Sequence, residues 1–256
     1  MTPLAAHALA GAGVRHGFFT REDGVSDGVF AGLNCSLGSG DDPAKVAENH
    51  RRALACLGLA PGALVTGYQV HGTDVAVVER AWRYADRPRV DGLVTRAPRV
   101  ALGILTADCA PVLFAEPAAG VVAAAHAGWR GAIGGVLETT LATMEKEGAR
   151  RERIAAAIGP CIGGRSYEVG PEFPAPFLAE RPENARFFAP AARAGNSLFD
   201  LGAYVEAKLK GLGVGRVERI AADTCADDVR FYSYRRACLR GEKQFGHLLS
   251  AIALVP

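Results

Sequence analysis

Three residues that could bind a metal ion or carry out nucleophilic chemistry each follow a short apolar run. They are His71 after residues 64–70, Cys109 shortly after residues 100–106, and His126 directly after residues 121–125. If these runs are strands, their ends can direct the three side chains into one pocket, although the residues are far apart in the sequence. Two imidazoles and a thiolate suit zinc, and three protein ligands leave a fourth position open, as catalytic zinc sites require.

Spacing alone does not separate a metal site from other roles for these residues. A buried cysteine or a hydrogen-bonded core histidine is the ordinary case. Cys109 as nucleophile and His126 as base would also suit a cysteine hydrolase. A structural zinc site would need a fourth protein ligand, and the spacing indicates none. Metal content is the observation that distinguishes a metalloenzyme from a cysteine hydrolase.

The elements that must position these residues alternate along the chain, with no linker rich in Ser, Gly or Pro between them. This alternation predicts an α/β protein with a single domain over residues 1–256. Helices are predicted at 43–58 after the N-cap Asp42, from 131 to 148, and at 201–212. Besides the three runs above, buried strands are predicted at 75–78, 112–115, 154–158, 217–220 and 252–255.

Charge and composition exclude several classes of protein. The chain of 256 residues has 29 Lys and Arg against 27 Asp and Glu, so the net charge of +2 implies no nucleic-acid partner. The apolar run at 100–107 is far shorter than the roughly 18 residues that span a membrane, and no signal peptide is evident. Six cysteines without a CxxC pair fit the cytoplasm. The five besides Cys109 are expected to be free thiols, most of them buried.

Several longer motifs, in fixed order over nearly the whole chain, resemble the YfiH-like family, which was long labelled a polyphenol oxidase or laccase-domain family. The motifs are QVHG at 69–72, LTADCAPV at 105–112, AHAGWRG at 125–131, IGPCIG at 158–163, YEVG at 167–170 and FYSYRR at 231–236. Shorter matches are TR at 20–21, GVS at 24–26, LN at 33–34 and GDDP at 40–43. The chain departs from the family pattern at Asp23 and Cys35, which could alter the mouth of the site.

The resemblance implies a four-layer α/β/β/α sandwich and one zinc ion bound by His71, Cys109 and His126. It also implies a purine nucleoside enzyme that cleaves inosine, guanosine, adenosine and methylthioadenosine with phosphate and deaminates adenosine with water. Copper could occupy the zinc position, with polyphenol oxidase activity as a side property. Six histidines are too few for the several copper centres of a laccase.

Further residues are expected to act on the substrate. Asp108, beside Cys109, is the nearest carboxylate that could carry a proton, and its alternative role is to orient a ligand or cap a turn. Arg130, in the turn before the helix at 131, is the first candidate to bind phosphate, helped by the dipole of that helix. Arg235 and Arg21 are the other candidates, and each arginine could instead be an ordinary surface residue. The oligomeric state and the preferred nucleoside stay open.

Overall fold

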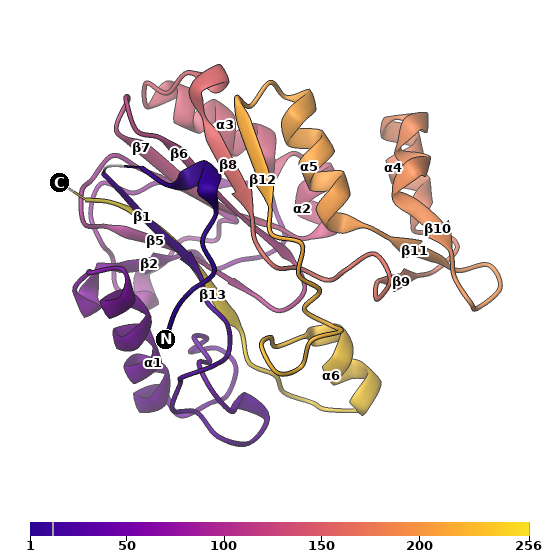
Figure 1. The fold of residues 1–256 in the computed structure, drawn as a ribbon, viewed down its shortest axis with the longest axis horizontal. Helices are drawn as coiled ribbons and strands as arrows, with labels where there is room; N and C mark the ends of the chain where they lie inside the picture. Colours follow the sequence, from indigo (N-terminus) through magenta and orange to yellow (C-terminus); the bar gives the residue numbers. More distant parts are fainter. Residues whose placement is uncertain (12, 256) are drawn as a thin grey trace.

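Two β-sheets lie face to face at the centre of the computed structural model, which describes residues 1–11 and 13–255 (Figure 1). The larger sheet contains, in spatial order, β12 (Arg216–Arg219), β8 (Ala155–Ile158), β6 (Ala110–Glu116), β7 (Val121–Ala127), β4 (Gly92–Thr95) and β3 (Val75–Val77). The smaller sheet contains β1 (Val14–Phe18), β13 (Leu248–Leu254), β5 (Ala101–Thr106) and β2 (Leu64–Thr66). The pairs β12–β8, β3–β4 and β2–β5 at sheet edges are parallel, whereas the edge pair β1–β13 and the central pairs are antiparallel.

Helices cover the outer faces of both sheets. The α-helices of the described residues are α1 (Pro43–Cys56), α2 (Trp129–Gly134), α3 (Val136–Lys146), α4 (Pro174–Glu180), α5 (Leu201–Gly211) and α6 (Tyr234–Arg240). Short 3-10 helices lie at His7–Leu9, Gly28–Phe30, Pro61–Ala63, Tyr84–Asp86, Arg151–Arg153 and Pro182–Phe187. Helices α2, α3 and α5 lie over the larger sheet, and α1 lies on the far side of the smaller sheet (Figure 1).

The alternation of side chains along the strands builds three apolar cores between four layers. In β7, Val121 and Ala123 pack toward α3 and α5, whereas Val122 and Ala124 pack between the sheets. A third core joins the outer face of the smaller sheet to α1. The predicted α/β/β/α sandwich is therefore confirmed. By the same alternation His126, two residues after Ala124, lies on the face between the sheets.

The helix signals in the sequence closely predicted the bounds of α1 and α5, but they were less accurate for the helix predicted at 131–148. The Asp42 carboxylate caps α1 by accepting a hydrogen bond from the Ala44 N–H at 2.8 Å. The helix predicted from residue 131 instead begins at Trp129 and is divided into α2 and α3. Gly135, with φ of 111°, makes the break, because this left-handed conformation interrupts a helix and favours glycine.

Strand predictions were correct in position but not always in burial or length. Strand β2 ends at Thr66 rather than at residue 70. Strands β3 and β12 were expected to be buried but are sheet edges, and Val77 is 42% exposed. The elements β1, β4, α4 and α6 and the small sheet of β10 (Phe188–Pro190), β11 (Ser197–Phe199) and β9 (Glu168–Val169) were missed. Most of them are too short to show a periodic pattern.

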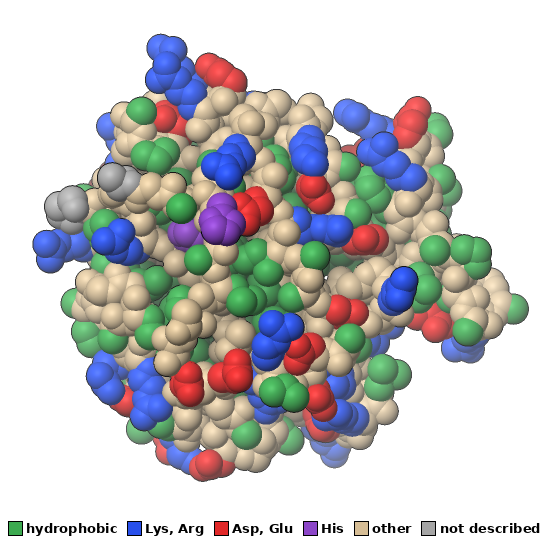
Figure 2. Space-filling view, in the orientation of Figure 1, with side chains coloured by type: hydrophobic (Ala, Val, Ile, Leu, Met, Phe, Trp, Pro, Cys, Tyr) green, Lys and Arg blue, Asp and Glu red, His purple; other side chains and the backbone are tan. Residues whose placement is uncertain are grey.

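The five cysteines outside the candidate site are free thiols, as expected, but most are not buried. Cys35 and Cys161 are buried, Cys225 is half-buried, and Cys56 and Cys238 are exposed. No helix in the described ranges is long and apolar enough to cross a membrane. On the face shown in Figure 2, positive and negative side chains are interspersed, in keeping with the net charge of +2.

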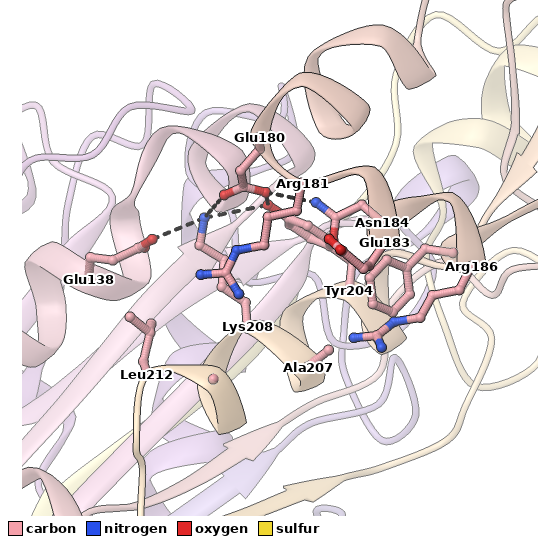
Figure 3. Close-up of a pocket in the computed structure, with 12 residues that line it drawn as sticks. Glu138, Glu180, Arg181, Glu183, Asn184, Arg186, Tyr204, Ala207, Lys208 and Leu212 are labelled. Carbon is pink, nitrogen blue, oxygen red and sulfur yellow. Dashed lines mark hydrogen bonds and ion pairs between the residues drawn. The ribbon is translucent and has the colours of Figure 1, made fainter.

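The β9–β11 sheet and α4 form a unit that projects from the main body (Figure 1). A cluster of charges around the largely buried Lys208, shown in Figure 3, fastens this unit to α3 and α5. The Lys208 ammonium, with only 10% of its side chain exposed, lies 3.0 Å from Glu138 Oε1 and 2.9 Å from Glu180 Oε1. The Tyr204 hydroxyl donates to Glu180 Oε2 at 2.7 Å. Lys208 therefore joins three helices at one point.

Replacing Lys208 with Met should lower the free energy of unfolding at pH 7 by about 1 kcal/mol, because two carboxylates lose their shared cation. Burial opposes the charged form of Glu180, but Lys208 and Tyr204 outweigh it and lower the pKa of this carboxyl. The contribution of ionised Glu180 to the free energy of unfolding is therefore present above the pKa of this carboxyl in the unfolded chain. It is lost as the pH falls through the pKa of the carboxyl in the folded protein.

The difference between wild type and Lys208→Met should consequently shrink below about pH 4, measured by urea unfolding across a pH series. Lys210→Met is the matched control. It removes an amine that is 59% exposed and pairs only with Glu206 on the same helix, so it should change stability by less than about 0.5 kcal/mol. A difference of equal size at pH 7 and pH 3.5 would contradict the role of Glu180.

Candidate metal centre and substrate cavities

The three predicted ligands converge at one end of the space between the sheets. His71 lies in the loop between β2 and β3, Cys109 in the turn between β5 and β6, and His126 near the end of β7. Their potential ligand atoms all lie within 4.8 Å of one another, and Cys109 Sγ is 3.7 Å from His71 Nε2. Among the described residues this is the one group of three or more side chains placed to hold a metal ion. His71 is exposed, Cys109 half-buried and His126 buried.

The carboxylate of Asp91, just before β4, organises this group from behind. Asp91 Oδ1 accepts hydrogen bonds from His126 Nδ1 at 2.8 Å and from the His71 N–H at 3.0 Å. Its Oδ2 accepts from the N–H groups of Gly72 at 2.7 Å and Val70 at 3.1 Å. With Nδ1 held by the carboxylate, His126 presents Nε2 as its free ligand atom. The buried Asp91 side chain thus orients the His126 ring and fixes the backbone at His71.

The sequence analysis missed Asp91, although a signal for it exists. Asp91 and Gly92 form an Asp-Gly pair at the start of the short apolar strand β4, so Asp91 lies at a strand boundary. The strand has only four residues and was not predicted, so the polar residue at its start went unnoticed.

The backbone around the three candidate ligands has unusual conformations and passes close to their side chains. His71 and Asp108 have φ values of 59° and 87°, a left-handed conformation that is uncommon outside glycine and that occurs often at functional sites. Gly128 lies against the group, and a Cβ placed there would be 2.9 Å from both Cys109 Sγ and His71 Cδ2. Only glycine fits at this position without displacing a ligand.

Electrostatics favour the charged, metal-binding form of the thiol. Burial opposes ionisation of Cys109, but attraction to His126 and hydrogen bonds from both imidazoles outweigh burial and lower the pKa of the thiol. Burial likewise opposes protonation of His126, yet the Cys109 and Asp91 anions raise the pKa of its ring. A bound cation would take the place of the proton that these groups share. The donor set and its surroundings therefore fit one metal ion with nitrogen and sulfur ligands.

Asp108 is held by hydrogen bonds that suit an anchoring role. It is 8% exposed, and its carboxylate accepts from Thr224 Oγ1 at 2.7 Å, Ser233 Oγ at 2.9 Å and the Arg235 N–H at 2.6 Å. Burial, the largest influence, raises its pKa despite these donors. These contacts favour the alternative role of Asp108, which is to orient a ligand or cap a turn rather than to carry a proton. They join the turn that carries Cys109 to the start of α6.

Two cavities lie beside the metal group, and His71, Ala107, Cys109, Arg130 and Tyr234 line both of them. The larger, of about 540 Å³, has a volume suited to a small organic ligand. Its other walls include the aromatic residues Tyr68, Tyr84, Phe245 and His247. The smaller, of about 170 Å³, is also lined by Asp108, Trp129, Tyr167 and Arg235. The cavity drawn in Figure 3 is separate and shares no lining residue with either.

Two of the three predicted arginines reach these cavities. Arg130 lies in the first turn of α2, with its guanidinium 4.4 Å from the centre of the Trp129 ring. Within the described part of the chain it makes no hydrogen bond or ion pair. Arg235 donates to the Glu168 carbonyl at 2.7 Å and lies 5.3 Å from the centre of the Tyr167 ring. The smaller cavity therefore has two cations in its wall.

The expectation for the third arginine, Arg21, needs correction. Arg21 does not line either cavity, because its guanidinium is held by the carbonyls of Ala31 and Asp228. Arg235 and its neighbour Arg236 lie in helix α6. The helix forms because Ser233 Oγ caps it by accepting from the Arg236 N–H at 3.1 Å. The Arg236 side chain donates to backbone carbonyls, among them that of Thr224, so Arg235 alone of this pair lines the smaller cavity.

Comparison with known proteins gives consistent matches over most of the chain. The family model described as multi-copper polyphenol oxidoreductase laccase matches residues 15–255. A purine nucleoside phosphorylase of Deinococcus radiodurans is 43% identical over 223 residues, covering 87% of this chain and 84% of the relative. The crystal structure of a Neisseria meningitidis protein of the DUF152 family has a TM-score of 0.88 at 35% identity, with all of both chains covered. The YfiH protein of Bacillus licheniformis has a TM-score of 0.86 at 28% identity, covering 94% of this chain and 92% of that one.

A multinuclear copper centre does not fit the residues that the structure describes. Such a centre needs several groups of ligands close together, whereas residues 1–11 and 13–255 contain the one group of His71, Cys109 and His126. The name of the matching family model therefore does not transfer to the chemistry of this site.

Replacing Asp91 with Asn should weaken metal binding by roughly 10- to 100-fold, measured by competition with a chromogenic chelator. The amide has one oxygen where the carboxylate has two, and its NH2 group would face the N–H donors of Gly72 or Val70. Asp86→Asn is the matched control, because Asp86 pairs only with the exposed Arg83. Equal metal affinity in wild type and Asp91→Asn would show that the carboxylate does not organise the ligands.

Proposed function

The chain belongs to the YfiH-like family, described as multi-copper polyphenol oxidoreductase laccase, and from this premise we propose that it is a zinc-dependent purine nucleoside phosphorylase. The family resemblance noted in the sequence is thereby confirmed. The proposal treats residues 1–256 as one catalytic domain and assigns it to the cytoplasm, where its free cysteines would stay reduced.

One observation carries the proposal. The metal group lies where an aromatic cavity of about 540 Å³ adjoins a smaller cavity whose wall contains Arg130 and Arg235. Phosphorolysis needs such a pair of compartments, because a planar base with its ribose and a phosphate anion must meet at C1′ of the sugar. Aromatic side chains suit the base, and arginines suit the phosphate. Both cavities share His71 and Cys109, so the two substrates would meet beside the metal ligands.

We assign zinc to the group because two imidazoles and one thiolate match its preferred ligands and leave a position for substrate or water. When bound, zinc would supply a Lewis acid that stabilises negative charge on a substrate oxygen or on water. Copper could bind the same three residues and give a minor oxidase activity, since Cu²⁺ generally binds such ligands more tightly.

The chain's own residues would bind and orient the reactants. In the proposed reaction, a phosphate oxygen forms a bond to C1′, the bond from C1′ to the base nitrogen breaks, and the base leaves with that electron pair. Arg130 would neutralise and orient the attacking phosphate. Arg235 would assist it, with its position set by the hydrogen bond from its N–H to Asp108.

The same site would also accept methylthioadenosine and would deaminate adenosine with water when phosphate is absent. Both extensions follow the family resemblance and use the same cavity and metal. In deamination Asp108 would act by keeping Cys109 and α6 in place, since three protein donors already occupy its carboxylate.

One specific observation supports a second candidate function. Cys109, His126 and Asp91 also form the nucleophile, base and orienting carboxylate of a cysteine hydrolase, and the pKa of the Cys109 thiol is lowered. The two functions differ in their need for metal, so metal analysis separates them.

Purified protein should contain one equivalent of zinc per chain, and His71→Ala or Cys109→Ala should lose metal and nucleoside cleavage together. Metal content is measured by elemental analysis, and activity by release of hypoxanthine from inosine in phosphate buffer. Cys161→Ala, which removes a buried thiol outside the group, is the matched control and should keep its zinc. A full equivalent of zinc in Cys109→Ala would refute the ligand assignment. Undiminished activity after complete chelation would instead support the cysteine hydrolase.

Arg130→Ala should raise the KM for phosphate by roughly tenfold or more, because charge-assisted hydrogen bonds to the anion are lost, while zinc content stays unchanged. The measurement is a phosphate titration at saturating inosine. Arg21→Ala serves as the comparison, because Arg21 lies outside both cavities, and its KM for phosphate should match wild type. Identical titration curves for wild type and Arg130→Ala would exclude Arg130 from phosphate binding.

A further inference from the structure

Two buried polar atoms in the wall of the larger cavity have no hydrogen-bond partner in the protein. Across residues 1–11 and 13–255, three buried side-chain N or O atoms lack a partner, on Thr106, Glu138 and His247. The atoms on Thr106 and His247 are Oγ1 and Nδ1, and both residues line the cavity beside the metal group. Because buried polar groups are normally paired, unpaired ones in the wall of a cavity indicate that a ligand supplies the missing partners.

These two residues lie at neighbouring strand ends of the smaller sheet, with His247 just before its strand. Thr106, at the end of β5, is paired with Leu248 of β13, and His247 immediately precedes Leu248. Thr106 is 2% exposed and continues the alternation of Leu102 and Ile104, which face the space between the sheets. The two residues therefore lie at adjacent strand ends of the smaller sheet, where both line the cavity.

An aromatic wall adjoins this polar pair. The Phe245 ring lies 5.0 Å from the His247 ring and 5.2 Å from the Tyr234 ring, and all three residues line the cavity. A flat heteroaromatic ring could stack on this wall while its polar edge reaches Thr106 and His247.

The hydrogen-bonding capacity of the pair is adaptable. Burial lowers the pKa of the His247 ring to about 4, so at neutral pH the ring carries one donor nitrogen and one acceptor nitrogen. The Thr106 hydroxyl can also donate or accept. His247 is not a member of the metal group, so its ring stays available to a substrate.

We propose that Thr106 and His247 recognise the edge of a purine base formed by N7 and the substituent at C6, with the base stacked on Phe245 and Tyr234. A 6-oxopurine presents two adjacent acceptors at this edge, and a 6-aminopurine presents an acceptor and a donor. Two groups that can each donate or accept would bind both. A pyrimidine has no N7 and would be rejected. This assignment rests on the proposed function and adds the means by which that site selects purines.

Equilibrium binding tests the proposal without depending on turnover. Metal-loaded protein is titrated by calorimetry with hypoxanthine, with 7-deazahypoxanthine, which lacks the N7 acceptor, and with unsubstituted purine, which lacks the group at C6. Wild type should bind hypoxanthine roughly tenfold more tightly than either analogue, the effect expected for one hydrogen bond. Thr106→Val and His247→Ala should each bind hypoxanthine about tenfold more weakly and should each lose the preference over one of the analogues.

Three further measurements distinguish the possible failures. Thr140→Val removes another buried threonine hydroxyl, in α3 and outside both cavities, and should keep the wild-type preferences. His247→Gln retains a donor and an acceptor, so it should recover part of the affinity lost in His247→Ala. Zinc content and thermal unfolding establish that each variant is folded.

The inference is overturned if Thr106→Val and His247→Ala both keep the wild-type preference over both analogues. If wild type binds none of the three bases and cleaves no nucleoside, the proposed function fails and this inference fails with it. If wild type binds hypoxanthine and cleaves inosine while neither variant changes base affinity, only the inference fails.

Discussion

The buried carboxylate of Asp91 is the constraint on which the candidate centre depends. It fixes the His126 ring through Nδ1 and holds the N–H groups of three consecutive residues, among them His71 in a left-handed conformation. Burying a charge in this way is costly unless donors surround it, and here four donors do so. Against the effect of burial, the same negative charge raises the pKa of the His126 ring. Ligand orientation, loop conformation and electrostatics therefore have one common origin.

A second carboxylate connects this centre to the walls of the neighbouring cavities. Asp108 joins the turn that carries Cys109 to Thr224 and to the first residues of α6, and α6 contributes Tyr234 and Arg235 to the cavity walls. The candidate metal ligands come from the ends of strands and the loops beside them, whereas the aromatic and cationic side chains that line the cavities lie mostly on short helices and loops. This division lets a rigid sheet hold the reactive groups while neighbouring segments determine which molecule reaches them.

The α/β pattern, the family resemblance and the convergence of His71, Cys109 and His126 could be predicted from the sequence, because apolar strand patterns, polar strand ends and short motifs are local signals. The sequence did not predict Asp91 or His247, whose roles depend on contacts between segments far apart in the chain. Their own elements also gave little signal, because β4 has four residues and His247 lies before the start of its strand. The sequence offered Arg21 as a further candidate after Arg130, and only the tertiary structure shows that backbone carbonyls already hold Arg21.

The central claim is that His71, Cys109 and His126 together bind one zinc ion. X-ray absorption at the zinc edge of the purified protein tests it most directly, because the fit counts sulfur and nitrogen neighbours separately. The account predicts one sulfur at about 2.3 Å and two imidazole nitrogens at about 2.0–2.1 Å, with a further light atom completing the shell. A shell without sulfur, or one containing two or more sulfur atoms, would contradict it.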